Sequence, residues 1–99
     1  MNITVKNEEK VYTLIIEGRV DTLTAPELEK VFRDNAEQAD KMIFDMYGVD
    51  YVSSAGIRAI VSAYKIMGNK DGLVLKGLRN NVLTIIRMTG LEKKLTIEE

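Results

Sequence analysis

"MIFDMYGVDYVSSAGIRAIVSAYK", residues 42–65, joins an apolar run to two serines, a glycine and a stretch with helical periodicity. Its first apolar residues, 42–44, do not alternate with polar ones, which predicts a strand buried on both faces and interrupted at Asp45. The apolar residues after the serines recur at the spacing of one helix face: Ile57, Ile60, Val61, Tyr64 and Met67. Gly68 and Asn69 are stop signals for this helix. The segment therefore predicts a strand followed directly by a helix.

The rest of the chain repeats this alternation. Apolar and β-branched residues predict strands over 3–5 and 11–17, and the short turn between them implies an antiparallel hairpin. A short strand is expected over 72–78, a helix over 80–90 that stops at its final glycine, and a last short strand over 95–97. The residues expected to face inward from the 80–90 helix are Val82, Ile85, Ile86 and Thr89.

A helix-start signature follows the hairpin, whose second strand is expected to close at Gly18. Thr24 is the expected N-cap, Pro26 falls in the first turn, and Glu27 stands at the capping-box spacing. The residues that then mark one helix face are Ala25, Leu28, Val31, Phe32 and Ala36.

The element order is β-β-α-β-α-β-α-(β), within a length that suits a single domain over residues 1–99. Strands that alternate with helices favour parallel pairing through right-handed crossovers. We therefore predict an α/β fold: a small mixed β-sheet, made of an antiparallel N-terminal hairpin plus parallel strands, covered by about three to four helices.

Composition excludes several functions. The formal net charge of −1 gives no electrostatic reason to expect nucleic acid or an anionic membrane as a partner. The absence of Cys and His removes disulfides, thiol nucleophiles, imidazole bases and the usual zinc ligands. No apolar run approaches the roughly 20 residues of a membrane span, and the first ten residues do not resemble a signal peptide. The expected location is the cytoplasm, and no cofactor, metal or small-molecule substrate is evident.

Chemistry is expected at the carboxyl edge of the sheet, where strands end and helices begin. One junction there carries Asp21 and Thr22, and the other carries Asp45 and Asp50 beside the two serines. The two carboxylates of the second junction offer acid/base chemistry or a Mg²⁺ site, whereas the structural alternative is that they hydrogen-bond loop N–H groups. A serine nucleophile lacks its usual His base, and no spacing singles out a lysine to replace it. The structural alternative is the stronger interpretation.

The paired serines admit two interpretations. In the first, Ser53 is only the N-cap of the following helix. In the second, Ser54 is in addition a free hydroxyl at the helix N-terminus, where first-turn N–H groups and the helix dipole stabilise an added phosphate. Gly56 is expected to keep the surface around these serines low enough for another chain to approach. The residues alone leave both interpretations open.

"FDMYGVDYVSSAGIRAIVSAYK", residues 44–65, resembles the segment that identifies STAS domains, specifically the bacterial anti-sigma factor antagonists. Residues 16–32, "IEGRVDTLTAPELEKVF", look like the strand–Gly–x–x–Asp–x–helix segment of the family. Residues 82–97, "VLTIIRMTGLEKKLTI", are similar to its C-terminal helix and tail. Three segments occur in the right order over almost the whole chain.

This resemblance implies a STAS-like fold and a protein that is not an enzyme. It implies binding to an anti-sigma factor that is itself a serine kinase, release of a sigma factor, phosphorylation of a loop serine and resetting by a phosphatase. Carried over by position, Ser54 is the phosphoacceptor candidate and Ser53, which stands where relatives carry Asp, is the second choice. Asp21 matches the loop aspartate of the family, and Asp45 matches the aspartate that ends its central strand. The residues expected to bind the partner are Asp21, Thr22, Ser53, Ser54, Gly56, Ile57 and Arg58.

Two alternatives remain. The loop sequence S-S-A-G, in place of D-S-S-G, favours a STAS-like interaction subunit of a signalling scaffold or transport complex that is never phosphorylated. A small nucleotide-binding or hydrolytic domain that uses Asp45 and Asp50 is the alternative from a different class.

Overall fold

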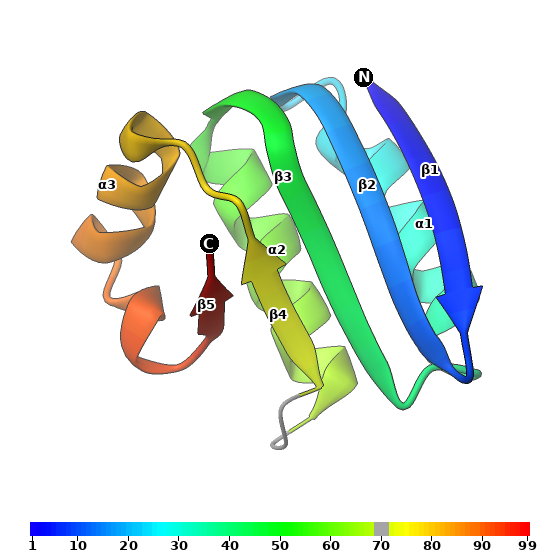
Figure 1. The fold of residues 1–99 in the computed structure, drawn as a ribbon. Coiled ribbons are helices and arrows are strands. Elements are labelled where there is room, and N and C mark those ends of the chain that lie inside the picture. Colours follow the sequence, from blue (N-terminus) through cyan, green and yellow to red (C-terminus); the bar gives the residue numbers. More distant parts are fainter. Residues whose placement is uncertain (69–71) are drawn as a thin grey trace.

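The computed structural model describes residues 1–68 and 72–99, and its elements follow the predicted order (Figure 1). The sheet has five strands in the order β1-β2-β3-β4-β5. The strands are β1 (Asn2–Glu8), β2 (Val11–Val20), β3 (Lys41–Val52), β4 (Leu73–Lys76) and β5 (Thr96–Glu98). The helices are α1 (Ala25–Ala36), α2 (Ser54–Met67) and α3 (Asn80–Met88), with a short 3-10 helix, η1, at Leu91–Lys93. β1 pairs with β2 antiparallel and the other pairs are parallel, as predicted.

The N-terminal hairpin is longer than the sequence suggests. Its turn is confined to Glu9 and Lys10, which both adopt positive φ, and the Lys10 N–H donates to Oδ1 of Asn7 at 3.0 Å. β2 does not close at Gly18, because it continues through this residue, at φ +103°, to Val20. This extension carries β2 to the same edge of the sheet as the end of β3.

The core lies on one face of the sheet. α1 and α2 both cover that face, behind the sheet in the view of Figure 1, while α3 lies beside its β4–β5 end. Phe32 of α1 and Phe44 of β3 pack with their ring centroids 6.0 Å apart. The prediction that β3 is buried on both faces is wrong, because Ile43 points away from the helices and is only half-buried.

β3 also does not end at Asp45. The strand runs seven residues further, and its register with β2 shifts by one residue twice, between Asp45 and Gly48 and between Val49 and Tyr51. Each shift is an irregularity like a β-bulge, in which β3 has one more residue than the β2 segment it pairs with. After each extra residue, the β3 side chains that face the core move to the next position along the strand. The buried positions are consequently spaced two, two, three and three residues apart: Met42, Phe44, Met46, Val49 and Val52.

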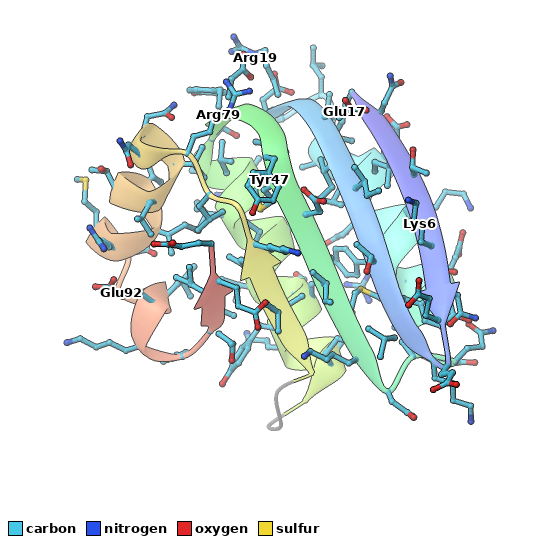
Figure 2. The ribbon with its side chains drawn as sticks, viewed as in Figure 1. Lys6, Glu17, Arg19, Tyr47, Arg79 and Glu92 are labelled. Carbon is cyan, nitrogen blue, oxygen red and sulfur yellow. The ribbon has the colours of Figure 1, made fainter. Side chains whose placement is uncertain are left out.

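The second half of β3 holds the start of α3 in place. The Arg79 Nε donates to the Tyr47 carbonyl at 3.0 Å, and Figure 2 shows both side chains beside the upper part of β3. The Asn81 side-chain amide donates to the Asp50 carbonyl at 2.7 Å. The Tyr47 ring lies so close to Gly77, at φ +72°, that a Cβ there would be 2.6 Å from the ring. These contacts fasten the β4–α3 connection to β3.

The helix boundaries agree with most of the sequence signals. Pro26 lies in the first turn of α1, but Thr24 makes no capping hydrogen bond with its side chain, so the capping box is absent. α2 ends at Met67 with Gly68, at φ +79°, as its C-cap, and Asn69 lies outside the described residues. Thr89 is exposed rather than inward, because α3 already ends there.

Candidate functional site

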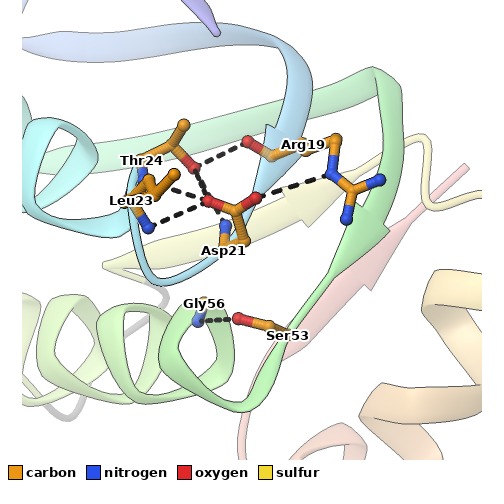
Figure 3. Close-up of polar contacts among 6 residues, drawn as sticks. All are labelled: Arg19, Asp21, Leu23, Thr24, Ser53 and Gly56. Atoms are coloured by element: carbon orange, nitrogen blue, oxygen red, sulfur yellow. Dashed lines mark hydrogen bonds and ion pairs between the residues drawn. The ribbon is translucent and has the colours of Figure 1, made fainter.

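The two loops singled out in the sequence lie side by side at the carboxyl edge of the sheet (Figure 3). Val20, at the end of β2, is the register partner of Val52, at the end of β3. The Ser53 N–H continues this pairing and donates to the Val20 carbonyl at 2.9 Å. The β2–α1 loop, with Asp21, and the β3–α2 loop, with Ser53 and Ser54, therefore form one surface, which we call the rim.

The β2–α1 loop is held by its own side chains. The Asp21 carboxylate accepts from the N–H groups of Leu23 at 3.0 Å and Thr24 at 3.1 Å. The Thr24 hydroxyl accepts from the Asp21 N–H at 2.9 Å and lies 2.7 Å from the Arg19 carbonyl, to which it donates. The pKa of Asp21 is lowered, mainly because its carboxylate accepts the Thr24 N–H. Desolvation has a smaller, opposing effect. The Leu23 N–H, the Thr24 hydroxyl and Arg19 each lower the pKa further. The loop is thus a preformed turn that carries a negative charge.

The two serines have different environments. Ser53 has extended backbone angles, φ −88° and ψ 178°, and its Oγ accepts from the Gly56 N–H at 3.4 Å, which makes it the N-cap of α2. Ser54 is the first residue of α2 and is exposed. Within the described part of the chain, its hydroxyl makes no hydrogen bond. The first turn of α2 carries no acidic residue, so the positive end of this helix is not neutralised locally.

Gly56 lies inside the fold rather than on the rim. It is buried, and a Cβ at this position would lie 2.7 Å from both the Val20 carbonyl oxygen and Cγ1 of Val52. The expectation that Gly56 offers a low surface to a partner is therefore wrong. Its small size instead lets the start of α2 approach the ends of β2 and β3.

The remaining predicted contact residues divide between surface and core. Thr22 and Arg58 are exposed, whereas Ile57 is half-buried and packs against the core. Thr22 and Arg58 share a shallow groove of about 210 Å³ between the first halves of α1 and α2. The other residues that line it are Ala25, Pro26, Glu29, Ala55 and Ala59. The structure thus brings Thr22 and Arg58 together beside the rim.

The carboxylates of Asp45 and Asp50 do not form a pair. Asp45 lies midway along β3 and accepts from the Tyr47 N–H at 3.2 Å, while Asp50 is exposed near the end of the strand. The two residues are five positions apart along an extended strand, roughly 15 Å, which is too far for one metal ion to bridge. Across residues 1–68 and 72–99, no cluster of three or more acidic side chains is arranged to hold a metal. This geometry gives no support to acid/base or Mg²⁺ chemistry at these two residues.

Leu23 and Tyr51 also lie at this surface, and neither was predicted from the sequence. Leu23, in the β2–α1 loop, has 88% of its surface exposed, and Tyr51 is 40% exposed beneath the Arg19 guanidinium, which lies 4.5 Å from the ring centroid. Arg19 and Tyr51 are register partners on β2 and β3. An apolar residue in a turn gives no pattern that predicts exposure, and the arginine–tyrosine contact depends on a register that is set by the bulges. Both residues add apolar surface to the rim.

The model of the STAS domain family matches residues 2–99. The chain belongs to the STAS domain family. A curated relative, the anti-sigma-B factor antagonist of Staphylococcus aureus, is 26% identical over 101 residues, which cover all of this chain and 94% of the relative. The described residues contain no helix that is long and apolar enough to cross a membrane.

Two solved structures share the fold. An anti-sigma factor antagonist from Mycobacterium paratuberculosis superposes with a TM-score of 0.89 at 21% identity, covering 98% of this chain and 84% of that one. The Bacillus cell fate determinant SpoIIAA in its phosphorylated form superposes with a TM-score of 0.75 at 10% identity, covering 97% of this chain and 90% of that one. These likenesses establish the STAS architecture of the chain.

Proposed function

We propose that this protein is an anti-sigma factor antagonist, a regulatory protein rather than an enzyme, whose rim binds an anti-sigma factor that is a serine kinase. The name of the Staphylococcus aureus relative supports the general role, and the pairing of Ser53 with Val20 supports the location, because it places both loops on one surface. The rim offers a partner the preformed turn at Asp21, the exposed apolar side chain of Leu23 and the hydroxyl of Ser54.

Phosphorylation of Ser54 regulates this interaction in our proposal. The observation that carries it is the difference between the two serines: the Ser53 hydroxyl caps α2, whereas the Ser54 hydroxyl is exposed and lacks a partner among the described residues. The kinase transfers the γ-phosphoryl group of ATP to the Ser54 Oγ, which loses its proton as ADP leaves. The added charge of about −1.5 to −2 lies at the N-terminus of α2 and next to the β2–α1 loop, where it disrupts a partner surface fitted to the neutral hydroxyl.

The test uses the kinase encoded beside this protein's gene, if the neighbourhood contains one, and otherwise an anti-sigma serine kinase from the same organism. Calorimetry with the unmodified protein should show a 1:1 complex. Incubation with ATP should add one phosphate to wild type and to Ser53→Ala, but none to Ser54→Ala, by intact mass. An equal gain of one phosphate in all three proteins would contradict the assignment of Ser54. Binding without any gain of mass would favour the interaction subunit that is never phosphorylated, and absence of binding would contradict the proposed role.

A further inference from the structure

Arg58 differs from the other arginines of the chain. Each of the other four has a local partner. Arg19 contacts Asp21 and lies over the Tyr51 ring, and Arg79 donates to the Tyr47 carbonyl. The other two form ion pairs, Arg33 with Glu29 and Arg87 with Glu92. Arg58 is exposed and makes no hydrogen bond, ion pair or ring contact with residues 1–68 or 72–99. Its guanidinium is therefore free to bind an anion.

The position of Arg58 on α2 directs it towards Ser54. The two residues are four apart in the same helix, a spacing that puts them on one face with Cβ atoms about 5–6 Å from each other. Long helical side chains lean towards the helix N-terminus, so the guanidinium extends from the second turn towards the first. A phosphate on Ser54 would lie within reach of it.

Competing charges at the rim are few. Arg19, Asp21 and Asp50 lie at or just after the ends of β2 and β3, and Glu29 lines the groove with Arg58. Arg79 donates to the Tyr47 carbonyl of β3. The Asp21 carboxylate already accepts two backbone N–H groups, and Glu29, across the groove from Arg58, is 3.8 Å from Arg33. Asp50 is exposed on β3 and repels a phosphate without offering it a hydrogen bond. Arg58 is thus a cation on the same helix as Ser54 that has no partner among the described residues and can pair with a dianion there.

We infer that Arg58 is an intramolecular clamp for phosphorylated Ser54. This inference rests on the proposed modification of Ser54 and specifies how it acts. In the unmodified protein the guanidinium is free to pair with a carboxylate of the partner. After phosphorylation it pairs with the phosphate, so one modification both adds charge to the rim and withdraws Arg58 from the partner.

The test places phosphoserine at position 54 during translation, which makes it independent of any kinase. The second pKa of the phosphate is then measured by ³¹P NMR titration in the otherwise wild-type protein, in Arg58→Gln and in the control Arg87→Gln, an exposed helical arginine on α3 that pairs with Glu92. Circular dichroism should show that all three are folded, because neither arginine is buried.

Arg58 should stabilise the dianion and lower the second pKa, so Arg58→Gln should raise it by about half a unit, as expected for a charge-assisted pair at this spacing. Arg87→Gln should leave it unchanged. The same second pKa in wild type and Arg58→Gln would overturn the clamp, as would an equal rise in both variants. Failure of a kinase to modify Ser54 would instead count against the proposed function, because the titration does not involve a kinase.

Discussion

Replacement of Gly56 by alanine tests whether close packing of α2 against β2 fixes the rim. The new Cβ would lie 2.7 Å from the Val20 carbonyl oxygen, 2.7 Å from Cγ1 of Val52 and 3.0 Å from Cγ1 of Val20. The carbonyl oxygen cannot withdraw freely, because it also accepts the Ser53 N–H at 2.9 Å. α2 must therefore move away from the sheet, or this hydrogen bond must lengthen.

The expected cost follows from two opposing effects. Overpacking of a close-fitting site costs typically about 1–3 kcal/mol, and contact with backbone favours the upper end of that range. Alanine is a better helix former than glycine by about 1 kcal/mol, which offsets part of the loss. The net loss in free energy of unfolding is then about 2 kcal/mol, or a fall in Tm of roughly 8–16 °C for a domain of this size.

The assay is urea and thermal unfolding of wild type, Gly56→Ala and the control Gly48→Ala. A Cβ at Gly48 would lie 2.9 Å from Cγ of Glu17, an exposed side chain that can rotate away, and 3.3 Å from Glu17 Cα and Cβ, so only mild crowding would persist. We therefore expect the control to lose about 1 kcal/mol or less. A Gly56→Ala protein as stable as wild type would refute the claim that contact with Val20 and Val52 sets the position of α2.

Three further variants examine the rim. Because the folded-state pKa of Asp21 is lowered from 3.8, its stabilising contribution is present above that value and is lost as pH falls through the folded-state pKa. In thermal melts between about pH 5 and pH 2, the Tm of wild type should therefore fall further than the Tm of Asp21→Asn. An equal fall in Tm for the two proteins would contradict this. Ser53→Ala removes the cap of α2 and should lower the free energy of unfolding by about 1 kcal/mol in urea titrations. An unchanged free energy of unfolding would show that the 3.4 Å contact between the Ser53 Oγ and the Gly56 N–H is not stabilising. Leu23→Ala should leave Tm unchanged but weaken binding to the proposed kinase about tenfold by calorimetry, as expected for loss of about 1–2 kcal/mol of apolar contact. The control Met88→Ala truncates a similarly exposed side chain at the end of α3 and should change neither Tm nor binding.

The sequence predicts the order of elements because helix periodicity and turn residues are local signals. It does not predict the length of β3, because the two register shifts with β2 disguise the alternation of buried residues after Asp45. A strand with regular alternation would have buried position 48, whereas the extra residue brings Val49 to the core instead. The error has a consequence for function, since a strand that ended at Asp45 would have placed this carboxylate at the rim.

At the rim, the sequence distinguishes the two serines because an N-cap and a first helical residue follow from position alone. It cannot predict the hydrogen bonds of the β2–α1 loop, since Thr24 was expected to cap α1 and instead bonds with the Arg19 carbonyl and the Asp21 N–H. The choice between these partners depends on how far β2 extends past Gly18. That distance is set by pairing with β3, which is a long-range property.

Ser53 stands where the resemblance to STAS loops leads us to expect an aspartate, and this difference changes the electrostatics of the proposed switch in a definite direction. An aspartate cap would place a negative charge at the N-terminus of α2 and would repel a phosphate on the next residue. Ser53 caps the helix without charge, and the first turn contains no acidic residue, so the helix dipole and Arg58 both remain available to the phosphate. Ser53→Asp, in the protein with phosphoserine at position 54, should therefore raise the second pKa of the phosphate above its value in the Ser53 protein by ³¹P NMR. An unchanged or lower pKa would show that the neutral cap does not favour the phosphorylated state.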